Sequence, residues 1–455
     1  LPRFTDLTHY TQCTILRLRI RYSNKINLSI MRLPVKSIRM STLAVAVAAL
    51  CVVVQAASSS KCFATKEDMS RPVSTDLQGI TDFGLTLFKE LFPYKESRNF
   101  FFSPYSIWSA LTLAYFGAKG NTESQLQEAL GVSDKVDLLK KWRSLEFMYK
   151  MRQVNNSNYI FNLANRAYFD KTVRLNPCLE NILSSELYVA DFSKANKVSS
   201  EINKWVSNVT KGRITDLVSP SDLVNANMVL ANAAFFKGTW LYQFKKSNTK
   251  KDIFYSSPQD FGFVDMMTQK GNFRHGMSEE LGAHILELPY TGEEVSMLLL
   301  LPPFITGDKG FDAMVNRLNS TTLQNALSNT WTLKVEVTIP KFKLEESVGD
   351  ELMGALAKMG VRDLFDRSLA NLTDFSPDGQ LSVGRTVHKA FVEVSEEGTE
   401  AAAATALLAF RSSRPVGPSK FVCNHPFMFI IYDNLTNNVL FMGAYKSPPK
   451  KNKPL

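Results

Sequence analysis

The sequence is poor in the residues and motifs on which most catalytic sites depend. It contains five histidines in 455 residues, and none lies in the His-Glu-x-x-His spacing that binds zinc in many hydrolases. The Gly-x-Ser-x-Gly turn of serine hydrolases, the phosphate-binding Walker loop and the glycine pattern of dinucleotide-binding domains are missing as well. Scattered histidines are usually hydrogen-bonded structural residues. We therefore expect a protein that is not an enzyme and that needs no metal or cofactor.

Cysteine is also scarce, which excludes a small fold held together by disulfides. Two of the five cysteines, Cys13 and Cys51, lie in N-terminal segments that we expect to be absent from the mature chain. Cys62, Cys178 and Cys423 remain, without the spacing of a metal site. Three cysteines can form at most one disulfide, so we expect one free thiol and a fold stabilised by its core.

Only one long apolar run stands out, residues 40–57, which begins at Met40 and ends in small residues. This is the pattern of a secretory signal peptide cleaved near Ala56 or Ala57. The run is too short and too close to the N-terminus to be a good membrane span. We expect a soluble, secreted, extracellular protein that does not contact membranes.

Residues 1–39 are strongly basic. They carry eight Lys or Arg against a single acid, Asp6, so they contribute 8 − 1 = +7 of the net charge of +10. We interpret them as upstream sequence that is absent from the mature chain, and residues 58–75 as an N-terminal extension. The remaining protein is only mildly basic, so its charge gives no reason to expect nucleic acid as a partner.

Hydrophobic periodicity predicts helices in the first third of the remaining chain and strands in the rest. Helical patterns cover residues 76–92, a segment from Pro104 to Gly117 or Gly120, a segment opened by a capping box at Thr122–Gln125, and residues 136–152 and 201–214. Strand patterns cover residues 159–169, 228–240, 295–301 and 331–339, and a hairpin of residues 427–432 with 439–442. In residues 331–339 strict alternation predicts one buried face, formed by Trp331, Leu333, Val335, Val337 and Ile339. No repeat or linker divides residues 76–447, which predicts one α+β domain followed by a disordered basic tail at 448–455.

An unusual alanine-rich stretch lies near the C-terminus, where four alanines, Ala401 to Ala404, follow Thr399 and Glu400. An alanine run alone predicts a helix or a linker, because alanine has the highest helix propensity. This run has no amphipathic stripe, however, and a loop rich in Arg, Ser and Pro follows it at residues 411–418. Uniformly small side chains could also let such a segment enter a narrow gap between two strands.

The stretch is similar to the hinge of the reactive-centre loop of an inhibitory serpin. Other segments resemble serpin signatures in the same order along the chain: residues 99–107, 203–214, 232–240, 381–390, 425–427 and 441–443. The resemblance covers residues 76–447, and the signal peptide and hinge look like those of secreted arthropod serpins. It implies an α+β fold of three β-sheets and about nine helices, with an exposed reactive-centre loop at about 396–418.

The resemblance also implies a function. A serine protease would cut the loop and form an acyl-enzyme, and the cut loop would insert into the main sheet as a new strand and trap the protease. The hinge would comprise Glu396, Glu397, Gly398, Thr399, Glu400, Ala401, Ala402, Ala403, Ala404, Thr405 and Ala406. In an extended strand alternate side chains share a face, so the buried face would carry Thr399, Ala401, Ala403, Thr405, Leu407 and Ala409. None of these is charged, so insertion would bury no unpaired charge.

The scissile bond follows less directly from the sequence. Counting from Glu396 as serpin loops usually run places the scissile carbonyl at Ser412, but Arg411 is the better chemical anchor for the acidic pocket of a trypsin-like protease. We favour cleavage at Arg411–Ser412 by a trypsin-like target. Cleavage at Ser412–Ser413 by an elastase-like target comes second and cleavage at Phe410 by a chymotrypsin-like target third, with Arg414 a further candidate.

The resemblance assigns further positions by motif. Ser103, Ser106, Asn232 and His388 match a polar cluster that governs opening of the main sheet, and Trp240 matches the tryptophan at the insertion point. They could equally be hydrogen-bonded core residues. Lys140, Lys141 and Arg143 could bind a glycosaminoglycan, or could form a solvated helix face. Sequons for N-glycosylation occur at Asn155, Asn208, Asn319, Asn371 and Asn434.

These features predict a secreted, monomeric inhibitor whose partner is a serine protease held in a covalent acyl complex. The rival hypothesis is a non-inhibitory serpin that acts as a carrier or storage protein. Such relatives usually carry bulky, proline or charged residues in the hinge, and the hinge positions expected to face the core here, Thr399, Ala401, Ala403 and Thr405, include none.

Overall fold

The structure is a computed structural model that describes residues 62–65, 68, 78–95, 98–155, 159–304, 307–378, 381–396 and 418–449. From Cys62 onwards the chain forms one compact unit. The upstream segment, the signal peptide, the hinge from Glu397 to Ala406 and the candidate cleavage sites from Phe410 to Arg414 lie outside the described residues. What we expect of them stays a prediction.

The described residues contain nine α-helices, the number that we expected. They are α3 (Gln78–Leu91), α4 (Pro104–Gly117), α5 (Gly120–Leu130), α6 (Lys135–Asn155), α7 (Pro177–Ile182), α8 (Ala195–Val209), α9 (Gly307–Arg317), α10 (Ser320–Ser328) and α11 (Asp350–Lys358). Helix α4 begins as predicted, because Pro104 fixes the first turn and the side chain of Ser103 accepts a hydrogen bond from the Ser106 backbone.

The predicted capping box of the third helix is wrong. Helix α5 starts at Gly120, earlier than the box would allow. The Thr122 hydroxyl instead accepts a hydrogen bond from the backbone of Asn371 at 3.0 Å, and the Gln125 side chain accepts one from the backbone of Arg362 at 2.9 Å. Contacts with a distant segment have therefore replaced the local cap.

The strands form two hydrogen-bonded sheets. The five-stranded sheet has the order β10 (Phe342–Val348), β11 (Arg385–Val394), β4 (Met228–Gly238), β2 (Tyr159–Asp170) and β3 (Leu187–Ala190). The nine-stranded sheet has the order β1 (Phe100–Phe102), β14 (Asn438–Tyr445), β13 (Phe427–Asp433), β8 (Val295–Leu301), β7 (Ala283–Pro289), β6 (Phe261–Ser278), β9 (Trp331–Pro340) and β12 (Ser419–Val422), with β5 (Lys250–Tyr255) attached to β6. Strand β6 pairs with β5 through its first half and with β7 through its second half. Two of the three expected sheets are thus continuous through this one long strand.

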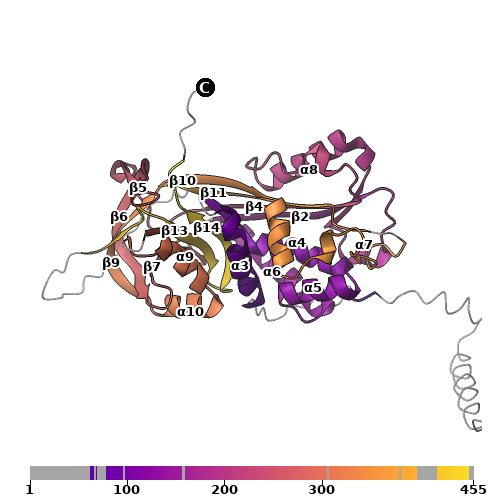
Figure 1. The fold of residues 1–455 in the computed structure, drawn as a ribbon, viewed down its shortest axis with the longest axis horizontal. Coiled ribbons are helices and arrows are strands. Elements are labelled where there is room, and N and C mark those ends of the chain that lie inside the picture. The colour runs from indigo at the N-terminus through magenta and orange to yellow at the C-terminus, as the bar shows by residue number, and fades with distance from the viewer. Residues whose placement is uncertain are drawn as a thin grey trace, which may run out of the picture. The chain divides into compact units, whose positions relative to one another are not determined.

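The five-stranded sheet is covered on both faces, as its almost continuously buried strand β4 requires. Val229, Ala231, Ala233 and Phe235 pack with the apolar face of α8. Leu230, Ala234 and Phe236 point to the opposite face and belong to the larger core. Figure 1 shows α8 on one side of this sheet and α4, α5 and α6 on the other.

Strand β9 differs from its prediction. Val335, Val337 and Ile339 are buried as expected, but Trp331 is 71% exposed and Leu333 44%. The neighbouring strand β12 pairs with β9 only from Val335 onwards. The alternation therefore identified the face correctly, but that face is buried only in the second half of the strand.

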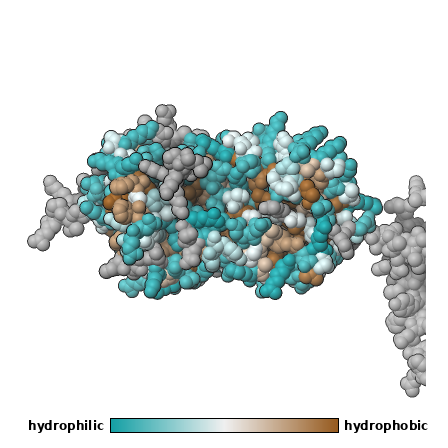
Figure 2. Space-filling model, turned by 45° about the horizontal axis from the view of Figure 1, so that its top comes forward, coloured by the Kyte–Doolittle hydropathy of each residue, from teal (hydrophilic) through white to brown (hydrophobic). Residues whose placement is uncertain are grey.

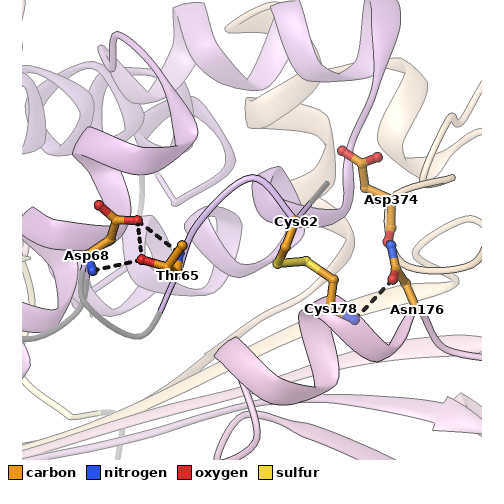
Figure 3. The surroundings of a disulfide bond; sticks show 6 residues. All are labelled: Cys62, Thr65, Asp68, Asn176, Cys178 and Asp374. Atoms are coloured by element: carbon orange, nitrogen blue, oxygen red, sulfur yellow. Dashed lines mark hydrogen bonds between the residues drawn. A yellow bond between two sulfur atoms is a disulfide. The ribbon is translucent and has the colours of Figure 1, made fainter. Parts of the chain in front are cut away.

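A disulfide joins Cys62 of the N-terminal extension to Cys178 of helix α7, with a Cα–Cα distance of 5.4 Å (Figure 3). The neighbouring residue Asn176 caps α7 by accepting a hydrogen bond from the Cys178 backbone at 3.1 Å. Cys423 is free and buried, so the prediction of one disulfide and one thiol is confirmed. The bridge fixes the extension to a helix 116 residues further along the chain.

Candidate functional site

The centre of the five-stranded sheet is a pair of parallel strands, β4 and β11. They are paired in register from Arg385 opposite Val229 to Val392 opposite Phe236. A strand that left β11, reversed direction and entered between them would run antiparallel to both, and antiparallel ladders are slightly more stable than parallel ones. The chain that follows β11 directly is the predicted hinge. Local topology therefore provides both a strand pair between which a third strand could insert and a segment adjacent to it.

A polar network lies beneath this strand pair. The period of two places Asn232 on the same face of β4 as Leu230 and Ala234, and therefore towards α4. Its amide nitrogen donates to the hydroxyl of Ser106 at 2.7 Å and to the Ser106 carbonyl at 3.0 Å. His388 of β11 is the register partner of Asn232, and the two side chains are hydrogen-bonded. The predicted cluster therefore exists, and it links the two strands that would have to separate.

The bonds of His388 determine its tautomer. Its Nε2 accepts a hydrogen bond from the backbone N–H of Ser103 at 3.2 Å. Nδ1 therefore carries the proton and donates to the side-chain amide oxygen of Asn232. The ring is completely buried, and this desolvation lowers the pKa of His388 to about 3. The histidine is therefore neutral at physiological pH, which suits a structural part of the network better than a proton-transferring one.

Ser103 completes the cluster by tying it to the other sheet. Its hydroxyl donates to the carbonyl of Leu440 in β14 at 2.6 Å and accepts from the backbone of Ser106. The five-stranded sheet adds one further member, Asn165 of β2, whose side-chain oxygen accepts a hydrogen bond from the side-chain amide of Asn232. Sequence reasoning missed Asn165, although it interrupts an apolar strand just as Asn232 does.

Trp240 lies just beyond the end of β4. Its indole N–H donates to the carbonyl of Ser395 at 2.8 Å, so it bridges β4 to the chain that leaves β11. Its ring stacks on Tyr290 with a centroid distance of 4.5 Å. This places Trp240 at the end of the strand pair where an incoming strand would first enter.

Glu396 is the first residue of the predicted hinge and the one hinge residue that the structure describes, and its side chain is anchored. The carboxylate accepts hydrogen bonds from Lys341 and from Thr249, each at 2.8 Å, and the residue is 5% exposed. Burial opposes ionisation, but the bonds from Lys341 and Thr249 outweigh it and lower the pKa of Glu396. Sequence reasoning missed Lys341 and Thr249, since no local pattern connects them to Glu396.

The three basic residues of α6 that could bind a glycosaminoglycan are each paired with an acid. Lys140 lies 3.1 Å from Asp68, Lys141 lies 3.0 Å from Asp137, and Arg143 forms a buried pair with Glu186 at 2.8 Å. These pairs neutralise much of the charge that a sulfated polysaccharide would need. Glycosaminoglycan binding stays a prediction, which retention on immobilised heparin would test.

The sequons differ in the environment of their asparagine. Asn208 and Asn319 are exposed. The side-chain oxygen of Asn371 accepts a bond from the Thr373 hydroxyl at 2.7 Å, and the amide of Asn434 donates to the Glu293 carbonyl at 2.9 Å. The side chain of Asn155 is outside the described part of the chain. Use of any of these sequons stays a prediction.

Within the described ranges, no three His, Cys, Asp or Glu side chains are grouped so that they could hold a metal ion. None of the helices in those ranges has the length and apolar character of a bilayer-spanning helix.

Known proteins resemble this chain over most of its length. A family model described as Serpin (serine protease inhibitor) matches residues 78–448. Serine protease inhibitor 88Ea of Drosophila melanogaster is 36% identical over 390 residues, which cover 82% of this chain and 90% of that protein. The leukocyte elastase inhibitor of Sus scrofa is 39% identical over 385 residues, or 81% of this chain and 98% of that protein. The crystal structure of uncleaved ovalbumin matches with a TM-score of 0.71 at 30% identity, covering 82% of this chain and 100% of that one.

Proposed function

Because this chain belongs to the serpin family, we propose that it is a suicide inhibitor of serine proteases. It acts as a protease inhibitor and not as an enzyme, in keeping with the names of its curated relatives. In the proposed reaction, the protease serine forms an ester with the carbonyl of Arg411. The bond to Ser412 breaks, and the Ser412 amine takes up a proton. Insertion of the freed hinge then traps this ester.

The observation that carries the proposal is the parallel pairing of β4 and β11 next to the hinge. The hinge continues directly from β11, so a turn after Glu396 would bring it back antiparallel to both strands. Two antiparallel ladders would replace one parallel ladder, which favours the inserted state. A native state that stores free energy for such an insertion is metastable by construction.

Two polar contacts between the strands must break before the hinge can insert. The hydrogen bond between Asn232 and His388 joins β4 to β11. The hydrogen bond from Trp240 to Ser395 joins the two chains at the end of the strand pair nearest the hinge. These contacts hold the sheet closed in the uncut protein. A freed hinge offers backbone hydrogen bonds along the whole gap in exchange.

We further propose that the protein is secreted, acts as a monomer and is directed at a trypsin-like protease that cuts the loop at Arg411–Ser412. The signal-peptide pattern at 40–57 supports secretion, and so does the disulfide, because disulfides persist mainly in oxidising compartments. An elastase-like target is the second candidate, favoured by the 39% identity to a protein named leukocyte elastase inhibitor.

The test is to incubate the purified protein with trypsin, elastase and chymotrypsin separately and to run denaturing gels. We expect a complex that survives denaturation with the true class of target, and a loop cut at Arg411–Ser412 by mass spectrometry. If every protease cuts the loop and stays active, the inhibitor proposal is wrong. A cut that also leaves the thermal stability unchanged would favour a carrier or storage protein, since insertion should raise it.

A further inference from the structure

Two histidines of the nine-stranded sheet differ from the others in their surroundings. His388 and His425 are buried, and both ring nitrogens of each are hydrogen-bonded. His275 and His284 are only partly buried, and within the described ranges no hydrogen bond is made to either ring. An imidazole whose nitrogen is not engaged in a hydrogen bond can bind a metal ion, and histidine is the commonest metal ligand in proteins.

The fold brings these two histidines together with a methionine. His275 and Met277 lie on β6 and His284 lies on β7, and residues 279–282 join the two strands in a hairpin. The register pairs Met277 with His284. Opposed residues share a face of an antiparallel pair, and so do residues two apart on one strand. His275, Met277 and His284 therefore share one face of the hairpin, and we call them the His–Met–His cluster.

The two imidazole rings are placed so that one ion can join them. The rings are within 8° of parallel, and their centroids are 5.8 Å apart. A metal ion lies about 2.0–2.1 Å from an imidazole nitrogen, which is itself about 1 Å from the ring centre, so a bridged pair spans up to about 6 Å. The ring of Phe421 packs edge-on against His275 with a centroid distance of 5.8 Å, and this contact limits the rotation of the imidazole.

Met277 supplies a third donor. Its side chain is 53% exposed, so the thioether is not enclosed in the core. Directly opposed Cβ atoms lie about 4.5–5.5 Å apart in an antiparallel pair. The long, flexible methionine side chain therefore reaches an ion held at His284. The donors of the cluster are two nitrogens and one thioether sulfur.

We propose that the His–Met–His cluster binds a copper ion. Zinc sites use imidazole, thiolate and carboxylate donors, whereas copper also accepts a methionine thioether beside two histidines. Among divalent first-row metals, Cu²⁺ binds a given set of donors most tightly. Magnesium and calcium require oxygen ligands, which these three side chains do not offer. The cluster lies on the nine-stranded sheet and not on the strand pair of β4 and β11, so copper binding is a property separate from protease inhibition.

Trp331 provides a reporter beside the cluster. It is the register partner of His275 across the pairing of β6 with β9, and it is 71% exposed. The other tryptophans lie on α4, α6 and α8 and beyond the end of β4. Figure 1 places β6, β7 and β9 at the left-hand end of the molecule, and Figure 2 shows apolar surface in brown beside hydrophilic surface in teal at that end. Copper(II) bound at the cluster should quench the fluorescence of this indole.

The test is titration of the purified protein with copper(II) chloride, followed by calorimetry and by tryptophan fluorescence. We expect one copper ion per chain and quenching on binding. His275→Gln and His284→Gln should each weaken binding by at least about tenfold, since loss of even an outer partner of a metal site costs about 10- to 100-fold in affinity. Met277→Leu, which nearly conserves the side-chain volume, should weaken binding as well.

Two further variants serve as controls. Met151→Leu replaces another exposed methionine, on α6, and should bind copper like the wild type. Trp331→Phe should keep the heat of binding and lose most of the quenching. Without copper, each variant should unfold at the same temperature as the wild type, which separates loss of the site from loss of the fold.

The other outcomes overturn the proposal in whole or in part. If both histidine variants bind copper as tightly as the wild type, the ion is held elsewhere and the cluster is not the site. If only Met277→Leu binds normally, the thioether is not a ligand and the preference for copper loses its basis. If zinc(II) chloride binds the same histidines more tightly than copper does, the assignment to copper is wrong.

Discussion

His388 illustrates how one buried side chain makes the stability of the folded protein depend on pH. Its pKa is lowered from 6.5 to about 3 by burial, so below pH 6.5 the unfolded chain binds a proton that the folded protein does not. Its contribution to stability is therefore complete above pH 6.5 and is lost as the pH falls towards 3. The loss amounts to about 1.4 kcal/mol per pH unit over that range.

The corresponding prediction concerns thermal unfolding between pH 7 and pH 5. The midpoint of the wild type should fall more steeply with decreasing pH than that of His388→Gln, because glutamine does not titrate. At pH 7 the variant should itself be less stable, since it disturbs the bonds to Ser103 and Asn232. Parallel pH profiles for the two proteins would contradict the assignment to His388.

Glu396 is a second single residue whose side chain matters, because it anchors the base of the loop. Replacing it by alanine removes two hydrogen bonds of a buried carboxylate, and we expect a loss of about 1–3 kcal/mol in stability. The uncut loop should then enter the sheet more readily. Inhibitory activity should therefore decay faster than that of the wild type during incubation at about 37 °C. Because the pKa of Glu396 is lowered, its contribution is present above pH 4.5 and is lost as the pH falls through the folded value.

The matched control for Glu396→Ala is Lys270→Ala. Lys270 pairs with Glu336 at 3.6 Å on the nine-stranded sheet, but its side chain is 59% exposed. Exposed pairs contribute about 0–1 kcal/mol, so this variant should keep its stability and its activity half-life. Equal decay of the two variants would show that the anchored carboxylate has no special role.

The hinge element offers a test of insertion that compares neighbouring residues. In an inserted strand Thr405 would face the core and Ala404 would face outwards. Thr405→Arg would then bury an unpaired charge. We expect this variant to be cut without trapping the protease, whereas Ala404→Arg should still trap it. The number of inhibitor molecules consumed per inactivated protease measures the difference, and similar values for both variants would exclude insertion with this alternation.

At the same scale, elements with strong local signals were predicted well. The start of α4 at Pro104 follows from proline geometry, and the hairpin of β13 and β14 follows from two apolar runs that flank a polar turn. Elements that depend on distant partners were predicted less well. The Thr122 hydroxyl bonds to the backbone of Asn371 instead of capping its own helix, and the first half of β9 is exposed although its sequence alternates.

The disulfide acts on the whole molecule, because it closes a loop of 116 residues. A crosslink stabilises mainly by restricting the unfolded chain, and we expect Cys62→Ser, Cys178→Ser to lose about 2–4 kcal/mol. Thermal unfolding should show a lower midpoint in the double variant. Cys423→Ser is the control, since it removes a cysteine without removing a crosslink. An unchanged midpoint in the double variant would mean that the core alone holds the extension in place.

The sequence by itself determined the secondary-structure type of most elements and the serpin family, because these depend on periodicity, propensity and the order of motifs along the chain. It also predicts the hinge. It also named most of the polar cluster, but only through the resemblance. The tertiary structure decided which residues meet: His388 with Asn232 at a separation of 156 residues, and Glu396 with Lys341 at a separation of 55. It likewise decided which cysteines pair and how β6 joins two sheets. Such contacts arise from the packing of the complete chain, and no local pattern encodes them.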